Sequence, residues 1–136
     1  MVDVFEEPQR RYIMSRVRNR DTAPEVAVRS IVHRLGYRFR THRSDLPGNP
    51  DIVLTRHRTV IFVHGCFWHG HRGCKRGARP TSNTGFWNAK LDTNIKRDRR
   101  NQRKLKHMGW KVLVVWQCQL RDKQKLAARI RRFLDN

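Results

Sequence analysis

Three short runs rich in apolar and β-branched residues constrain the fold more than any other feature of the chain. They span residues 51–55, 59–63 and 111–116. Only a short polar turn separates the first two, so we expect them to pair as a hairpin and the third to form a buried strand. A further strand is expected over residues 37–43, where polar and apolar residues alternate. The sequence therefore predicts a sheet at the centre of the fold.

Helical patterns precede and follow these strands. A first helix is expected to begin with Thr22 as its N-cap and Glu25 at the capping-box position, and to end at Gly36. A long basic helix is expected over residues 86–108 and a last helix over residues 122–134. The apolar stripes expected on the first two helices are Val26, Ile31, Val32 and Leu35, and Trp87, Leu91, Ile95, Leu105 and Met108. This order of elements predicts an α/β fold with a mixed β-sheet flanked by helices, in a single domain of 136 residues.

The chain carries a large excess of positive charge. It has 31 Lys and Arg against 11 Asp and Glu, a formal net charge of +20 and a pI near 11.6. So basic a domain indicates a polyanionic partner. Nucleic acid is favoured over a membrane surface because tryptophans and arginines recur together along the chain. We expect the polar and basic residues 1–20 to form an arm or a short helix that contacts DNA.

The compartment is predicted from what the sequence lacks. No apolar run approaches the roughly 18–20 residues of a membrane span. The first residues have neither the basic start nor the apolar stretch of a secretion signal. We therefore expect a cytoplasmic protein without a membrane partner. Three cysteines in such a reducing compartment argue against a disulfide framework and for a metal site.

The cysteines lie in a pattern that suits a metal ion. Cys66, His71 and Cys74 share one short loop, and Cys118 follows the last strand. Three thiolates and one imidazole form a closed tetrahedral set of the kind that holds a structural Zn²⁺. A redox-inert ion would hold together a loop that is too polar to pack by itself. Two alternatives stay open, namely Cys118 as a buried apolar residue and His69 as the histidine ligand.

A second metal site is predicted at Asp51, which directly follows Pro50 at the start of an expected strand. In nucleases, a carboxylate at such a position binds the Mg²⁺ that polarises the phosphate. A Pro-Asp pair alone is usually a turn. The neighbouring strand gives it weight here, because the backbone carbonyl of Val63 and the imidazole of His64 at its end could face the same ion.

Five segments together resemble one known family. They are residues 20–25, 46–51, 60–69, 86–87 with 97–100, and 109–118, and the run His-Gly-Cys-Phe-Trp-His within the third is the most specific. In this order they resemble the very-short-patch repair (Vsr) endonuclease family over nearly the whole chain. The resemblance implies a type II restriction endonuclease-like fold with a structural zinc site. It also implies an enzyme that nicks DNA on the 5′ side of the thymine in a T·G mismatch, the product of 5-methylcytosine deamination.

The resemblance also implies the catalytic residues. Asp51 would be the central Mg²⁺ ligand, joined by the backbone carbonyl of Val63, with two ions expected. His69 would act as general base on the attacking water, a role that suits a histidine at neutral pH. Glu25 and His64 would act through contacts to water and phosphate, although without the resemblance the preferred interpretation of Glu25 is a capping-box residue. The products would be a 5′-phosphate and a 3′-hydroxyl.

The sequence differs at two points from the patterns of related nucleases, and the first difference favours the Vsr family over ordinary restriction enzymes. Ordinary restriction enzymes have an acid and a lysine where Phe62 and His64 stand, and Vsr enzymes share this difference. Better-known Vsr members have threonine where Val63 stands, so a carbonyl ligand is kept but a hydroxyl contact is lost.

Aromatic and basic residues are the predicted DNA contacts. A pair of rings in a polar loop, such as Phe67 and Trp68, can wedge between base pairs and unstack them, whereas Trp110 and Trp116 are expected to pack in the core. The contacts implied by the resemblance are Phe67, Trp68 and Trp87 as intercalating rings from the major groove, Met14 and Val17 in the minor groove, Lys90 and Asn94 at the mismatched pair, and Arg97 and Arg100 on phosphates.

The predicted partner is double-stranded DNA with a T·G mismatch, bound by a monomer. By resemblance, a MutL-type mismatch-repair protein and a cytosine-5 methyltransferase are functional partners. Two alternatives remain: a restriction-type endonuclease that cuts matched DNA, and a zinc-stapled DNA-binding module without catalysis.

Overall fold

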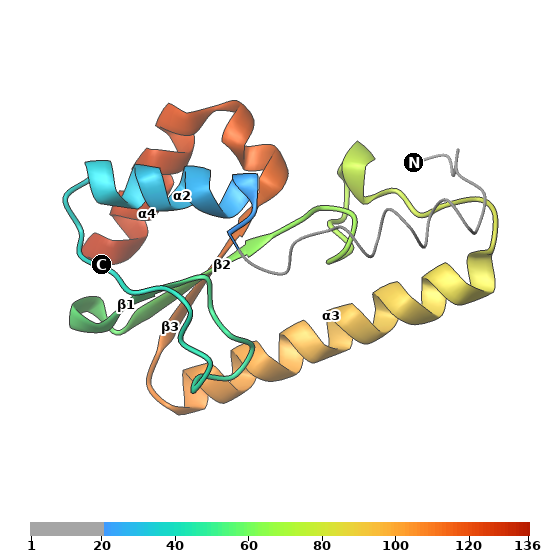
Figure 1. Cartoon of the computed structure of the whole chain (residues 1–136), viewed down its shortest axis with the longest axis horizontal. Coiled ribbons are helices and arrows are strands. Elements are labelled where there is room, and N and C mark those ends of the chain that lie inside the picture. The colour runs from blue at the N-terminus through green and yellow to red at the C-terminus, as the bar shows by residue number, and fades with distance from the viewer. Residues whose placement is uncertain (1–20) are drawn as a thin grey trace.

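The computed structural model describes residues 21–136, and Figure 1 shows its architecture. Predictions for the N-terminal arm, including Met14 and Val17, lie outside the described residues. The helices and strands are α2 (Ala23–Arg34), β1 (Ile52–Leu54), β2 (Thr59–His64), α3 (Thr84–His107), β3 (Lys111–Trp116) and α4 (Lys123–Asp135). Three short 3₁₀ helices join them: η1 (Thr55–His57), η2 (Lys75–Gly77) and η3 (Gln117–Arg121).

The described part of the chain forms a mixed sheet of three strands in the order β1-β2-β3. β1 and β2 pair antiparallel as the predicted hairpin, with Ile52 opposite Ile61. β2 and β3 pair in parallel, with His64 opposite Trp116. All six residues of the central strand β2 are buried, as expected for a strand covered on both faces. The prediction of a mixed sheet flanked by helices is confirmed.

Helices cover the two faces of the sheet. α2 and α4 pack on one face, and α3 passes along the other (Figure 1). The first core combines Ile52, Ile61 and Val115 of the strands with buried residues of α2 and α4, among them Val32 and Ile130. The second core combines six buried residues, Leu46, Val53, Val60, Phe62, Leu105 and Trp110. The two cores hold the ends of β2 and β3 in a fixed place, which matters for the site below.

The predicted strand over residues 37–43 is wrong. The segment makes one isolated antiparallel bridge, between Arg40 and Val53, and is otherwise irregular. β1 has only three residues, so it offers an outer strand little to pair with. His42 has a φ of 60°, in the left-handed region, which turns the chain away from an extended path.

Two residues of the predicted apolar stripes are exposed. Val26 is 51% exposed, whereas Val28, Ile31 and Val32 form the buried face of α2. A spacing of two residues is about 200° around a helix, so Val26 and Val28 point to opposite sides. Met108 is 48% exposed because it caps the end of α3 instead of lying within it. No helix among residues 21–136 has the length and apolar character that crossing a bilayer requires.

Candidate active site and metal centre

A cleft of about 470 Å³ lies where the strand ends meet the start of α2 and the middle of α3. The predicted catalytic and Mg²⁺-binding residues all line it: Glu25, Asp51, Val63, His64 and His69. They come from four parts of the chain, namely α2, the residue before β1, the end of β2 and the loop after it. α3 adds further lining residues, Arg97, Asp98, Asn101 and Gln102. The structure therefore brings together every residue that sequence reasoning placed at the reaction centre.

Asp51 is held at the base of this cleft by the hairpin. Its Oδ2 accepts a hydrogen bond of 2.6 Å from the backbone N–H of Val63. Burial raises the pKa of Asp51 to about 6; the Val63 N–H opposes the rise and the nearby charge of Glu25 adds to it. A buried carboxylate beside a second carboxylate is expected to hold either a proton or a cation. The carboxylate and carbonyl oxygens of Asp51 and Val63 are hard donors of the type that Mg²⁺ prefers, so the residues present fit that ion.

Glu25 serves the helix start and the cleft together. The N–H of Glu25 donates to Thr22 Oγ1 at 3.5 Å, as expected for an N-cap. The carboxylate of Glu25 accepts instead from the N–H of Asp21 at 2.8 Å, one residue before the cap, and from Arg29 at 3.3 Å. Arg29 also binds Asp21 at 2.7 Å. These contacts fix Glu25 at the cleft wall, so the capping and site positions coexist.

The two predicted catalytic histidines stack on each other. The rings of His64 and His69 lie 3.8 Å apart with an angle of 5° between their planes. Burial and, to a smaller extent, positive charge on His69 lower the pKa of His64 to about 3, so His64 is neutral at physiological pH.

Asp98 on α3 is a site residue that sequence reasoning missed. Its Oδ2 lies 2.6 Å from Nδ1 of His69. Burial raises the pKa of Asp98, but the hydrogen bond and charge of His69 outweigh this and lower it, so Asp98 is ionised. An ionised Asp98 accepts from Nδ1–H and leaves Nε2 of His69 as the proton acceptor. The sequence did contain a sign of this role, because Asp98 is one of only two acidic residues in the 24-residue basic helix α3.

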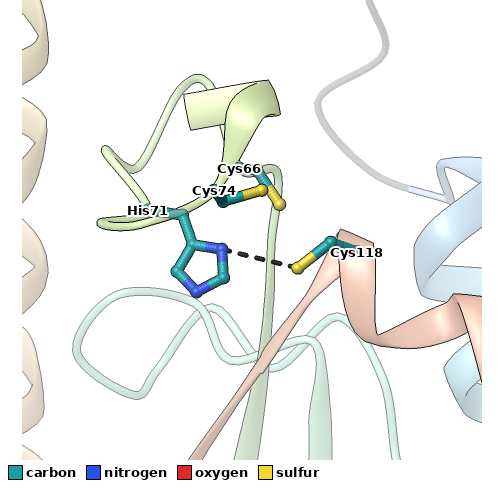
Figure 2. Close-up of side chains that lie close together, drawn as sticks. All are labelled: Cys66, His71, Cys74 and Cys118. Carbon is teal, nitrogen blue, oxygen red and sulfur yellow. Dashed lines mark hydrogen bonds between the residues drawn. The ribbon is translucent and has the colours of Figure 1, made fainter. Parts of the chain in front are cut away.

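The second cluster is the candidate metal centre. Ligand atoms of Cys66, His71, Cys74 and Cys118 all lie within 4.8 Å of one another. Figure 2 shows the four side chains converging, three from the loop after β2 and Cys118 from the segment after β3. Cys118 Sγ lies 3.5 Å from Nδ1 of His71. A Cβ at Gly77 would collide with the carbonyl oxygen of His71, so glycine is required where η2 folds back on the ligand loop.

The donor set of this centre suits a soft or borderline cation. Burial raises the pKa of the Cys66 thiol to about 11, so at neutral pH this sulfur keeps its proton unless a cation holds the thiolate. Burial also raises the pKa of Cys74, but the N–H groups of Arg76 and Gly77 and the neighbouring thiols outweigh it and lower the pKa. His69 is bound to Asp98 and stands outside the set, whereas His71 completes it. Three sulfurs and one nitrogen are the composition of a closed tetrahedral site.

The predicted intercalating rings form one aromatic cluster. Ring centroids of Phe67 lie 5.0 Å from Trp68 and 5.3 Å from Trp87, and Trp68 and Trp87 are 5.9 Å apart. Phe67 and Trp68 are partly exposed. Trp87 is only 2% exposed, so in this conformation it is the buried ring against which the two loop rings pack. Phe86, 5.1 Å from Trp87, is 46% exposed and extends the cluster outward.

Of the predicted DNA contacts on α3, the three basic side chains are exposed and the asparagine is buried. Lys90, Arg97 and Arg100 are exposed, and Arg97 also lines the catalytic cleft. Asn94 is 8% exposed, and its Nδ2 donates to the carbonyl of Trp68 at 3.0 Å. In this conformation Asn94 therefore ties α3 to the aromatic loop instead of presenting its amide to solvent.

The two strand-side tryptophans differ from each other. Trp110 is 6% exposed and lies in the core, as predicted, with the guanidinium of Arg58 over its ring at 4.4 Å. The same prediction for Trp116 is wrong, because Trp116 is only partly buried and stacks on His71 at 4.1 Å. The end of β3 carries Trp116 past the sheet core and into the region between the two clusters.

The mixed sheet flanked by helices, with Asp51 before β1 and the end of β2 lining one cleft, has the arrangement of the restriction endonuclease-like fold of DNA-cleaving enzymes. The catalytic domain of the homing endonuclease I-Bth0305I has a similar fold, with a TM-score of 0.59 and 23% sequence identity over 83% of this chain and 94% of that chain. Within this class, the family model for DNA mismatch endonuclease Vsr matches residues 2–76. The protein belongs to the Vsr family of DNA endonucleases, whose members include nicking enzymes.

Two relatives illustrate the match. The type II nicking enzyme V.XorIIP of Xanthomonas oryzae pv. oryzae is 53% identical over 135 residues, covering 99% of this chain and 98% of that protein. The DNA mismatch endonuclease Vsr of Escherichia coli K12 is 43% identical over 126 residues, covering 93% of this chain and 80% of that protein. The similarity therefore extends beyond the region of the family model and includes α3, β3 and the second half of the site.

Proposed function

We propose that the protein is a Mg²⁺-dependent endonuclease that nicks one strand of duplex DNA on the 5′ side of the thymine in a T·G mismatch. The observation that carries the proposal is the cleft, where Asp51, the Val63 backbone and the His69–Asp98 pair lie together. The names of the relatives, a DNA mismatch endonuclease and a nicking enzyme, support the substrate and the single-strand cut. Its role would be repair of deaminated 5-methylcytosine.

Asp51 and the carbonyl of Val63 would hold Mg²⁺, and two ions are proposed. The chemistry that Mg²⁺ supplies there is polarisation of the scissile phosphate. Nε2 of His69 accepts the proton of the attacking water, while Asp98 keeps the imidazole in the required tautomer through Nδ1. His64 and Glu25 contact the phosphate and its waters from the cleft wall. In-line displacement breaks the bond between phosphorus and the 3′ oxygen, which takes up a proton from water, and yields a 5′-phosphate and a 3′-hydroxyl.

Recognition of the mismatch is assigned to the aromatic cluster and to further residues that contact the mismatched pair, the phosphates and the minor groove. Phe67 and Trp68 would enter the base stack, at a cost of a few kcal/mol that is smaller at a mismatched pair. Trp87 supports them, and its own intercalation requires that it leave its buried position. The remaining proposed contacts are Lys90 and Asn94 at the mismatch, Arg97 and Arg100 on phosphates, and Met14 and Val17 in the minor groove.

We assign Zn²⁺, as one structural ion, to the set of Cys66, His71, Cys74 and Cys118. The ligand composition supports this choice, because three thiolates and an imidazole leave no open position for catalysis. The whole chain is proposed to act as a single domain and as a monomer in the bacterial cytoplasm. A MutL-type repair protein and a cytosine-5 methyltransferase are its proposed functional partners.

A nicking assay tests the proposal with four labelled duplexes that differ only in one pair, T·G, T·A, C·G or A·G. Wild-type protein with Mg²⁺ should cut only the thymine strand of the T·G duplex, 5′ of that thymine. Asp51→Asn should abolish the cut. Asp45→Asn is a matched control, because Asp45 is exposed and pairs with Arg43 away from the cleft. It should cut normally.

Each other outcome overturns a stated part of the proposal. A double-strand break in the matched duplex would indicate a restriction-type enzyme. Binding of every duplex without a cut would indicate a DNA-binding module without catalysis. A cut that persists in Asp51→Asn would remove Asp51 from the mechanism.

A further inference from the structure

We propose that Trp116 is a positioning residue. It holds the ring of His64, and through it the ring of His69, in a fixed orientation relative to the metal centre. This inference rests on the proposed function, in which His69 is the general base, and deepens it. It starts from an unbroken series of ring contacts that joins the two clusters of the site.

Trp116 lies between the metal centre and the catalytic histidines. Its indole stacks on the imidazole of His71 with centroids 4.1 Å apart and an interplanar angle of 7°. The indole also makes an edge-to-face contact with the ring of His64, at 5.2 Å and 74°. His64 in turn stacks on His69 at 3.8 Å. Within residues 21–136 no ring contact joins Trp116 directly to His69, so the series of ring contacts between them runs through His64.

The backbone makes this arrangement well defined. His64 and Trp116 are the last residues of β2 and β3 and are direct partners in the parallel register. The N–H of Trp116 donates to Oε1 of Gln119 at 2.9 Å, which fixes the chain where it leaves the sheet. Two residues later, Cys118 enters the metal set. The indole is therefore anchored to both the sheet and the metal centre.

The histidines need such a support because space remains around them. A cavity of about 370 Å³ between the strand ends and α3 is lined by His64, His69, His71 and Trp116. Asp98 holds His69 at one edge of its ring, through Nδ1, and the stacked ring of His64 covers one of its faces. Trp116 in turn limits the motion of His64. Removal of the indole would enlarge this cavity and leave His64 with the more distant ring of Phe62, at 5.8 Å, as its aromatic neighbour besides His69.

The experiment compares Trp116→Leu, Trp116→Phe and the matched control Trp110→Leu. Among residues 21–136, Trp110 makes no ring-to-ring contact with another aromatic or histidine side chain. It lies in the second core cluster, with the guanidinium of Arg58 over its ring. Four quantities are measured for each zinc-loaded protein: the single-turnover nicking rate at saturating enzyme on the T·G duplex, DNA affinity without Mg²⁺, the melting temperature, and the NMR shift of the His69 Cε1–H.

Trp116→Leu should lower the saturated rate about tenfold, the size expected when an aromatic contact that fixes a catalytic group is lost. DNA affinity should stay within about twofold, because the indole lines no part of the aromatic DNA cluster. The His69 resonance should shift although Trp116 does not touch that ring. Trp116→Phe should restore most of the rate. Trp110→Leu should lower the melting temperature but leave the rate and the His69 shift unchanged.

Three results would overturn the inference while the proposed function stands. They are a wild-type rate in Trp116→Leu, an equal loss of rate in Trp110→Leu, and a loss confined to DNA affinity. An unmoved His69 resonance would also overturn it, and this readout does not depend on cleavage. Failure of the wild-type protein to nick the T·G duplex would instead refute the proposed function.

Discussion

The carboxylate of Asp51 should destabilise the protein in the absence of Mg²⁺, and replacing it with Asn should relieve this cost. The folded-state pKa of Asp51 is about 6, against 3.8 for the ordinary group, because the side chain is buried. A rise of about two pKa units corresponds to about 3 kcal/mol, at about 1.4 kcal/mol for each unit. Asn keeps an oxygen that accepts from the Val63 N–H, so the hydrogen bond at this position survives the change.

The sign of the effect depends on pH. Below pH 3.8 Asp51 is protonated in both the folded and the unfolded chain, so wild type and Asp51→Asn should be equally stable with respect to this group. Between pH 3.8 and about 6 the folded protein keeps the proton that the unfolded chain has lost, so wild-type stability falls as pH rises. Above pH 6 the difference is constant, and Asp51→Asn should be more stable by up to about 3 kcal/mol.

Urea denaturation followed by tryptophan fluorescence measures this difference from pH 4 to pH 8, with zinc present and Mg²⁺ omitted. Subtraction of wild type from variant at each pH isolates Asp51 from other titrating groups. Asp45→Asn is the control, because hydrogen bonding to Arg43 lowers the pKa of exposed Asp45 below this pH range, so its difference from wild type should not change with pH. Addition of Mg²⁺ at pH 8 should stabilise wild type more than Asp51→Asn. A difference that does not change with pH, or an Asn variant less stable at pH 8, would refute the reasoning.

Further predictions concern the rest of the site. Asp98→Asn should lower the saturated nicking rate about 100-fold and leave DNA affinity unchanged, because the variant can favour the wrong tautomer of His69 and general-base catalysis contributes about 10²–10⁴-fold. An unchanged rate would remove Asp98 from the mechanism. Burial of neutral His64 should make wild type less stable relative to His64→Gln as pH falls from 6.5 toward 3, because the unfolded chain takes up a proton that buried His64 does not. Urea titrations of the two proteins measure this difference, which opposes the contribution of Asp51 over part of the same range. Cys118→Ser, or a zinc chelator, should lower the melting temperature as well as the activity, and an unchanged melting curve would contradict a structural metal. Trp68→Ala should reduce nicking of the T·G duplex more than non-specific DNA affinity, whereas equal losses would contradict the wedge.

The sequence predicted the hairpin, the third strand and the long basic helix, because apolar periodicity and β-branched runs are local signals. It failed for residues 37–43, where alternation is present but the neighbouring strand β1 is too short to pair with a fourth strand. Val26 was misplaced because the helical period was applied without fixing which face turns inward. Local pattern thus identified elements better than it identified their buried faces.

The cluster of Cys66, His71, Cys74 and Cys118 was predictable because thiolates have few uses in a reducing compartment and their chemistry is distinctive. Asp98 was missed because its role comes from a contact with His69, 29 positions away in sequence. The place of Trp116 was missed for a similar reason, since its neighbours are set by strand register and not by its own sequence context. Contacts of this kind follow from the assembled fold alone.

The central claim is that Asp51 and the backbone of Val63 form the divalent-cation site of the cleft. A crystal soaked in Mn²⁺ and measured at the manganese absorption edge tests it most directly, because anomalous scattering locates the ion. We predict a peak about 2.2 Å from a carboxylate oxygen of Asp51 and from the Val63 carbonyl, and its loss in Asp51→Asn. The ligand atoms of His64, His69 and Asp98 also lie within 4.8 Å of one another. A peak at that group, with none at Asp51, would contradict the account, because His69 could not then act as the base.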